Sequence, residues 1–206
     1  MSDSHHITTA EQLESLYGQP VFTALDKEVD HITPHYRQMI AASPFVVLST
    51  VGPEGTDCSP RGDPPGFVQV LDDRTVALPD RRGNNRIDSL RNIVRDPRVS
   101  LLFLIPGMGE TLRLNGEAVI STDPDLMAGF AMQGKLPQSV LVVTVERVYF
   151  QCQKALARSR LWQSDAQVDR ASLPTAGDII KGLTSAEFDS QKYDADYPER
   201  MKRTIY

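Results

Sequence analysis

The middle of the chain consists of short runs of β-branched and apolar residues separated by turn signals. The clearest run is residues 45–51 (FVVLSTV), and the turn sequence GPEG follows it directly. Together they predict a hairpin whose second strand leads directly into residues 59–63. Runs of this kind are typical of strands. The pattern predicts strands at residues 45–51, 67–71, 75–78, 98–105, 110–120 and 139–150. So many short strands close together predict an antiparallel sheet or barrel.

Helical spacing of apolar residues appears on both sides of these strands and between them. It predicts helices at residues 9–17, 34–42, 85–95 and 123–130. Thr9, Thr33 and Asp123 are expected as helix N-caps, and Pro34 fits a first helical position. From Gln151 the chain is mainly polar and is expected to be helical in pieces. Its last residues mix tyrosine with charge, which is typical of an arm that lies on another surface.

Composition narrows the function classes. The chain has 206 residues and a formal net charge of -5, so it offers no overall electrostatic reason to bind nucleic acid or an anionic membrane. Two cysteines are too few for a disulfide scaffold, and they lack the spacing of metal ligands. No apolar run has the length of a membrane span, and the N-terminus lacks the features of a signal peptide. We therefore expect a cytoplasmic protein without a metal site.

Two arginine-rich stretches stand out against this acidic background. They are residues 59–63 (SPRGD) and 79–86 (PDRRGNNR), each expected where a strand ends. Arginine offers a planar fork of donors to phosphate oxygens, and glycine lets backbone N–H groups approach closely. Asn85 and Arg86 are expected at the start of a helix, where free N–H groups also favour an anion. The alternative is that these arginines form weak surface ion pairs with nearby aspartates.

The order of these elements resembles the pyridoxamine 5'-phosphate oxidase-like superfamily of flavin-binding split barrels. The resemblance covers residues 34–162. It rests on an arginine after the second strand (Arg61), a phosphate-binding turn before a helix that ends in Asp96-Pro97, and the next pair of strands, residues 99–103 and 112–118. Residues 152–162 also look like a segment in a branch of uncharacterised FMN-dependent proteins. The implied fold is mainly β, a six- to eight-stranded antiparallel split β-barrel with helical N- and C-terminal extensions.

The resemblance also implies domain limits and a cofactor. Residues 1–33 would form an N-terminal helical extension, residues 34–162 the FMN-binding barrel, and residues 163–206 a C-terminal helical arm that takes part in the dimer. FMN would lie at a homodimer interface to which both subunits contribute. Its phosphate would contact Arg61, Arg81, Arg82, Asn85 and Arg86, and its ribityl chain and ring would contact Ser59, Gly62, Asp63, Pro79 and Asp80.

Further implied contacts lie later in the chain. Thr111 stands where the pyridoxamine oxidases have a glutamine, so one ring contact is expected to be lost. Arg158 and Ser159 precede Trp162, which would either stack near the flavin or only anchor the C-terminal segment. The substrate-phosphate residues of the pyridoxamine oxidases have no counterparts at residues 123–139. Gln133 and Lys135 are polar residues there that nothing in the sequence distinguishes from surface residues.

The expected function is that of an FMN-dependent oxidoreductase, which passes hydride or electrons between the flavin and a small-molecule substrate. The flavin would supply the chemistry, so no side chain is named as catalytic. Two alternatives remain open on the same fold. One is a non-enzymatic module that binds or senses a flavin, or that has recruited haem. The other is a reductase that uses a deazaflavin.

Overall fold

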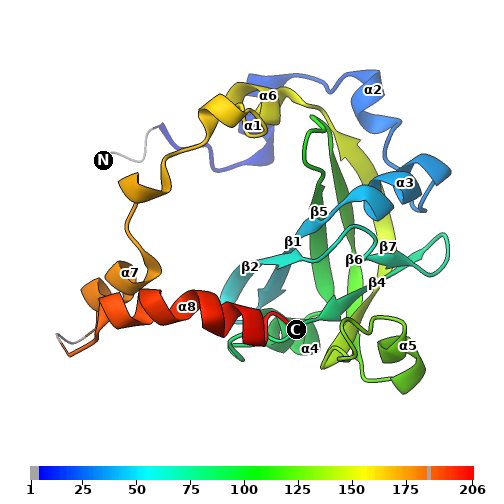
Figure 1. Ribbon diagram of the computed structural model, residues 1–206. Helices are drawn as coiled ribbons and strands as arrows, with labels where there is room; N and C mark the ends of the chain where they lie inside the picture. The colour runs from blue at the N-terminus through cyan, green and yellow to red at the C-terminus, as the bar shows by residue number, and fades with distance from the viewer. Residues whose placement is uncertain (1–4, 185–186) are drawn as a thin grey trace.

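The chain folds around one antiparallel sheet, as the computed structural model shows for residues 5–184 and 187–206. Its seven strands lie in the order β2-β1-β5-β6-β7-β4-β3, so the sheet is not closed and β2 and β3 are its edges (Figure 1). This confirms the predicted split barrel. The strands are β1 (Phe45–Gly52), β2 (Gly55–Gly62), β3 (Gln69–Val70), β4 (Thr75–Asp80), β5 (Arg98–Leu104), β6 (Thr111–Ser121) and β7 (Ser139–Gln151).

Alternating burial explains why these runs form strands around a common core. Val46 and Leu48 of β1 are fully buried, and Leu101 and Phe103 of β5 lie opposite them in the antiparallel register. Side chains of one face therefore meet in the barrel interior, as the period of two requires. A bulge between β6 and β7 falls at Gly116, where an added Cβ would collide with the carbonyl group of Thr144.

Helices lie beside the sheet and in both extensions. Thr9, Thr33 and Asp123 accept hydrogen bonds from backbone N–H groups at helix starts, so these three predicted caps are confirmed. The helices are α1 (Ala10–Tyr17), α2 (Phe22–Leu25), α3 (Pro34–Ala42), α4 (Asp88–Arg95), α5 (Pro124–Ala128), α6 (Lys154–Ser159), α7 (Ala176–Leu183) and α8 (Ser190–Thr204). Within the described ranges, no helix is long and apolar enough to cross a membrane.

Three sequence expectations about the arginine stretches and their surroundings are wrong. Ser59, Arg61 and Gly62 lie inside β2 and not beyond it, because residues 55–62 pair with the whole of β1. Pro79 and Asp80 likewise belong to β4, which continues through its pairing with β7. The helix expected from residue 85 begins only at Asp88, since Asn85 and Ile87 have left-handed backbone angles, φ 60° and 53°.

One predicted strand is much shorter than expected. Of residues 67–71 only Gln69–Val70 pairs with β4. The helix predicted at residues 9–17 is observed as α1, which begins at Ala10 after its cap Thr9.

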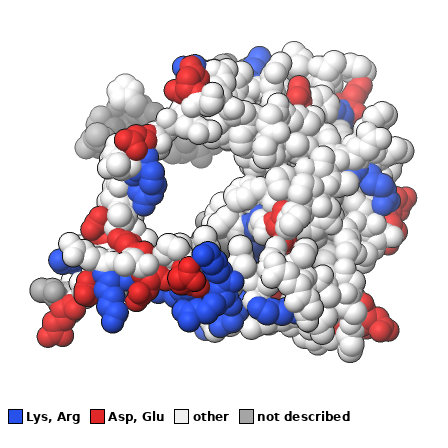
Figure 2. Space-filling model, in the orientation of Figure 1, with Lys and Arg blue, Asp and Glu red and all other residues white. Residues whose placement is uncertain are grey.

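The C-terminal segment leaves the sheet and returns to it. After α6 it runs outward through α7, and α8 brings it back to the part of the sheet near α4 (Figure 1). Figure 2 shows an opening between this segment and the rest of the molecule. Gly177 and Asp194 join α7 to α8 through a hydrogen bond of 2.9 Å from N–H to carboxylate. The segment is thus held by its two ends and by contacts within itself.

Candidate functional site

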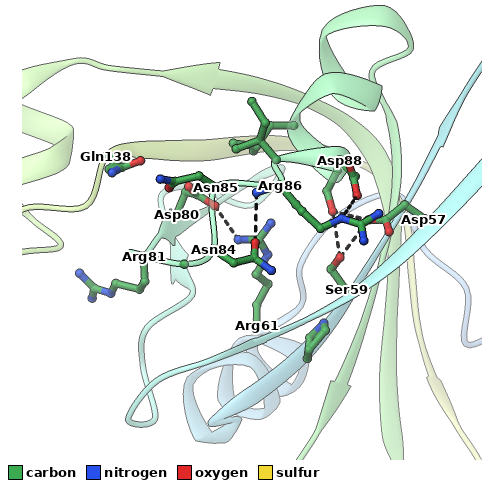
Figure 3. A pocket seen from close by; sticks show the side chains of 15 residues that line it. Asp57, Ser59, Arg61, Asp80, Arg81, Asn84, Asn85, Arg86, Asp88 and Gln138 are labelled. Carbon is green, nitrogen blue, oxygen red and sulfur yellow. Dashed lines mark hydrogen bonds and ion pairs between the residues drawn. The ribbon is translucent and has the colours of Figure 1, made fainter. Parts of the chain in front are cut away.

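A cavity of about 430 Å³ lies between β2, the end of β4 and the loop that leads into α4 (Figure 3). This size falls in the range of about 300–1,000 Å³ that is usual for small-molecule and cofactor sites. Both predicted arginine stretches contribute to it. Its lining residues are Asp57, Ser59, Pro60, Arg61, Asp80, Arg81, Gly83, Asn84, Asn85, Arg86, Ile87, Asp88, Ser89, Leu90 and Gln138. We call this space the larger cavity, to distinguish it from a smaller one of about 190 Å³ that adjoins it.

Arg61 and Asp80 form the most buried ion pair that lines the larger cavity. The Arg61 Nη1 to Asp80 Oδ1 distance is 2.5 Å, and the two side chains are 20% and 12% exposed. The Arg61 Nε atom is buried and has no hydrogen-bond partner among the described residues. Buried donors are almost always satisfied, so an orphaned donor on a cavity-lining arginine indicates a missing acceptor.

A second group of polar side chains joins β2 to the start of α4. The Oδ2 atom of Asp57 accepts hydrogen bonds from Ser89 Oγ at 2.5 Å and Ser59 Oγ at 2.9 Å. These two hydrogen bonds lower the pKa of Asp57 below its ordinary value of 3.8, and the bond from Ser89 has the larger effect. Asp57 is therefore negatively charged at neutral pH, and this part of the cavity does not favour a phosphate.

The loop before α4 is more open. Arg86 donates from Nε to Asp88 Oδ2 at 2.8 Å, yet its side chain remains 79% exposed and free to turn toward a ligand. The N-cap position of α4 is Ile87, which provides no side-chain hydrogen bond, so the first N–H groups of the helix lack a cap. Asp88, Ser89 and the loop residue Asn85 all line the larger cavity. Uncapped N–H groups beside an arginine suit an anionic ligand.

Asp63 lies at the centre of a separate network. Its side chain is 2% exposed, and its carboxylate accepts hydrogen bonds from Arg81 Nε and from the Tyr206 hydroxyl, each at 2.6 Å. Arg81 also donates to the carbonyl of Phe130 at 2.6 Å. In Figure 3 the Arg81 side chain points away from Arg61. Asp63 and Arg81 thus fix the loop after β2 to the end of α8, and Arg81 also lines the larger cavity.

Other predicted residues lie outside the larger cavity. Gly62 and Pro79 belong to the strands beside it without lining it, and Arg82 lines a neighbouring smaller cavity. Thr111 is buried opposite Gln151 at the end of β7. Asp80, in contrast, pairs with the first residue of β7. A strand of thirteen residues spans roughly 40 Å, which separates Thr111 from Asp80 within one chain.

The remaining predicted contacts also lie near that end of β7. Arg158 and Ser159 are exposed on α6, and Trp162 donates from its indole N–H to the carbonyl of Met108 at 2.7 Å. None of the three lines the larger cavity. We refer to Thr111, Arg158, Ser159 and Trp162 together as the α6 end. The structure therefore divides the predicted contacts into two groups and does not bring them together in a single chain.

Sequence reasoning missed five polar residues of the larger cavity, and three of them show what signal was or was not available; the five are Asp57, Asn84, Asp88, Ser89 and Gln138. Asp57 lies two positions before Ser59 on the same face of β2, so strand alternation could have identified it. Ser89 lies in the first turn of α4, where a position beside an anion site could be inferred. Gln138 immediately precedes β7 and has no local signal, since only the pairing of β7 with β4 brings it to the cavity.

Comparison with known proteins identifies the barrel. Residues 32–152, more than half of the chain, match the model of the family described as Pyridoxamine 5'-phosphate oxidase. No curated protein matches the chain. Three solved structures illustrate the similarity, and all have TM-scores below 0.5.

The first is HupZ of Group A Streptococcus, which is 19% identical and covers 57% of this chain and 91% of its own, with a TM-score of 0.46. A candidate pyridoxamine 5'-phosphate oxidase of Lactobacillus delbrueckii is 20% identical and covers 59% of this chain and 95% of its own, with a TM-score of 0.46. General Stress Protein 26 of Bacillus anthracis is 18% identical and covers 55% and 88%, with a TM-score of 0.42.

Proposed function

Because the chain belongs to the pyridoxamine 5'-phosphate oxidase family, we propose that it is a flavoprotein that binds FMN in the larger cavity. When bound, the flavin supplies hydride or electron transfer to or from a small-molecule substrate. The observation that carries the proposal concerns Arg61, which lines that cavity: its Nε atom is buried and has no hydrogen-bond partner among the residues that the structure describes. A phosphate oxygen is the acceptor that this donor lacks.

The residues around Arg61 fit a phosphorylated ligand. The uncapped start of α4 offers N–H groups, and Asn85 and Arg86 add a side-chain amide and a mobile guanidinium beside it. The carboxylate of Asp57 lies at the first turn of α4, where Ser89 donates to it, and would repel a phosphate that came close to it. We therefore assign the phosphate to Arg61, Asn85 and Arg86. Ser59 and Asp80 are assigned to the hydroxyl groups of the ribityl chain.

A second copy of the chain would complete this site. The α6 end lies away from Asp80 in its own chain, and two of its members, Arg158 and Ser159, are exposed on α6. The opening between the C-terminal segment and the sheet in Figure 2 leaves space for another surface. We therefore propose a homodimer in which the α6 end of each subunit reaches the flavin of its partner, with Trp162 near the ring.

The proposal does not extend to pyridoxamine 5'-phosphate as the substrate. Residues 123–139 lack the substrate-phosphate residues that the family resemblance would require, and the loop there instead presents Lys135 and Gln138. No side chain of the larger cavity is assigned a proton-transfer role, since the flavin itself is the redox group.

The test is direct titration. Purified protein should be yellow or should bind added FMN with micromolar or tighter affinity, and both Arg61→Ala and Arg86→Ala should bind it more weakly. Oxidation of a reduced nicotinamide by the loaded protein would distinguish an enzyme from a flavin carrier. The proposal would be refuted if the protein is folded by circular dichroism but is colourless and does not bind added FMN.

A further inference from the structure

The C-terminal segment is fastened to the sheet region by one tyrosine just after α8. Among the described residues, every hydrogen bond that joins positions 163–184 or 187–206 to positions 34–151 is made by Tyr206. Trp162 fixes the other end of the segment through its bond to Met108. Between these two points α7 and α8 pack on each other, and Figure 1 shows α8 returning to the sheet near α4. The return of the segment therefore depends on the contacts of Tyr206.

Tyr206 connects two loops that lie far apart in the sequence. Its hydroxyl donates to Asp63 Oδ1, in the loop after β2, at 2.6 Å. Its main-chain oxygen accepts from Lys135 Nζ, in the loop before β7, at 2.7 Å. The guanidinium of Arg81 lies 5.6 Å from the centre of its ring, which adds a cation–π contact. Both loops are thus held at one point by a residue that arrives from the end of the C-terminal segment.

The acceptor of the hydroxyl is a buried charge. The side chain of Asp63 is 2% exposed, and its other oxygen accepts from Arg81 Nε at 2.6 Å. Hydrogen bonds to a carboxylate are stronger than those between neutral groups, so the bond from Tyr206 is the main contact of the attachment. The same bond raises the pKa of Tyr206, so its hydroxyl stays protonated at neutral pH and continues to donate.

This attachment lies at the edge of the larger cavity. Tyr206 lines the smaller cavity, and Arg81 and Gln138 line both cavities. Asp63 binds Tyr206 and Arg81 at the same time, so the position of Tyr206 and that of a wall residue of the larger cavity depend on one carboxylate. Two attractive contacts to side chains and one to a main-chain oxygen are few enough for the attachment to open while the sheet stays folded.

We infer that Tyr206 is a latch: its bond to Asp63 holds the C-terminal segment against the edge of the larger cavity, and release of this bond opens that edge to the exchange of ligand. When Tyr206 leaves, the smaller cavity loses part of its wall, and water reaches the larger cavity past Arg81 and Gln138. The inference rests on the proposed function, because the ligand that exchanges is FMN. Tyr206 acts through Asp63 and Arg81, so it is a positioning residue.

The latch couples the C-terminal segment to the occupancy of the larger cavity. A ligand that contacts Arg81 fixes the side chain that shares Asp63 with Tyr206, and it therefore favours the closed state. The coupling is reciprocal: if closure of the segment strengthens FMN binding, FMN must favour closure by the same factor. A hydroxyl that only stabilised the fold would not produce this dependence on the ligand.

The experiment uses Tyr206→Phe, which removes the hydroxyl and keeps the ring. Tyr197→Phe is the matched control, since Tyr197 is an exposed residue of α8 whose hydroxyl forms no hydrogen bond with a described residue. Two quantities are measured on the full chain. One is the rate at which bound FMN is released, followed by the return of its fluorescence after dilution. The other is hydrogen–deuterium exchange of peptides from α8, with and without FMN.

We expect Tyr206→Phe to release FMN about tenfold faster than the wild type, the effect of losing one hydrogen bond to a charged group. In the wild type, FMN should slow exchange in α8. In Tyr206→Phe, exchange in α8 should be faster and should no longer respond to FMN. Tyr197→Phe should behave like the wild type in both measurements.

Either of two results would overturn the latch while the flavin proposal stands. One is release of FMN from Tyr206→Phe at the wild-type rate. The other is an effect of FMN on α8 exchange that is the same in Tyr206→Phe and in the wild type. If no FMN binds at all, the flavin proposal fails separately. Faster α8 exchange in Tyr206→Phe than in Tyr197→Phe would then still support the attachment by Tyr206, and equal exchange would overturn it.

Discussion

The larger cavity and the α6 end are both assigned to the same flavin, yet they are built very differently. At the cavity, partly buried charges are fixed by ion pairs and hydrogen bonds, and one donor of Arg61 has no partner in the described part of the chain. At the α6 end, Arg158 and Ser159 are exposed and only the indole of Trp162 is anchored. In the proposed homodimer, the cavity would therefore be largely formed within one chain, whereas the α6 end would acquire its surroundings from the partner.

The strongest test of the preformed cavity is Arg61→Ala. It removes the unpartnered donor and leaves the buried carboxylate of Asp80 unpaired. FMN affinity should fall about a hundredfold, as expected for loss of charge-assisted bonds to phosphate. The free energy of unfolding should fall by about 3 kcal/mol because the buried carboxylate of Asp80 is left without its ion-pair partner. Fluorescence titration with FMN and urea denaturation measure the two effects.

Arg74→Ala is the matched control for that substitution. Arg74 pairs with Asp30 at an exposed position, with side chains 53% and 59% exposed. Its removal should change stability by less than about 1 kcal/mol and should leave FMN affinity unchanged. If Arg61→Ala behaves like Arg74→Ala, the cavity does not hold the phosphate.

The next largest effect is expected at the α6 end. Trp162→Ala should weaken FMN binding by about tenfold, because an aromatic contact to the ring is lost. The informative experiment mixes Trp162→Ala protein with Arg61→Ala protein after dissociation. If the α6 end acts on the partner, random reassociation gives mixed dimers with one intact site, about a quarter of all sites.

Recovery of tight FMN binding in the mixture would establish that the two groups act from different subunits. Unchanged FMN affinity of Trp162→Ala would mean that the indole only anchors the C-terminal segment to Met108. If each variant by itself, before mixing, binds FMN with wild-type affinity, neither Arg61 nor Trp162 contacts the flavin.

A smaller effect on stability should distinguish the two regions without any ligand. Ser89→Ala removes the stronger of the two side-chain hydrogen bonds to Asp57 and should cost about 1 kcal/mol. In the folded wild type the pKa of Asp57 is lowered, so its carboxylate contributes stability at neutral pH that is lost as the pH falls through that lowered value. The unfolding free energy of Ser89→Ala should therefore decline less steeply between about pH 5 and pH 3.

Urea denaturation across this pH range measures the slope. Ser159→Ala, which removes an exposed hydroxyl of the α6 end, should follow the wild-type curve. An equal slope in Ser89→Ala and wild type would show that the Asp57 network does not depend on Ser89.

The smallest effect is expected for Arg86→Ala. Because Arg86 is exposed and pairs with Asp88 at the surface, its loss should weaken FMN binding only about threefold and change stability by less than about 0.5 kcal/mol. The salt dependence of FMN affinity should become weaker in the same variant. A loss as large as that of Arg61→Ala would mean that Arg86, although exposed, holds the phosphate as strongly as Arg61 does.

Local sequence patterns determined much of this protein. Runs of β-branched and apolar residues identified most strands, and Thr9, Thr33 and Asp123 marked helix starts, because these signals depend on near neighbours in the chain. The two arginine stretches could be recognised as anion-binding candidates from residue type alone. The strand limits around them were misplaced, since pairing with β1 and β7 continues each strand past its last apolar residue.

Tertiary structure alone decided which charges meet. Arg61 pairs with Asp80, nineteen positions away, and Tyr206 reaches Asp63 across 143 positions. Neither pairing follows from a local pattern, because the order of the strands and the return of α8 bring these residues together. For the same reason the sequence could name Arg82 and Thr111 as flavin contacts but could not determine that Arg82 borders a second cavity and that Thr111 lies at the opposite end of β7.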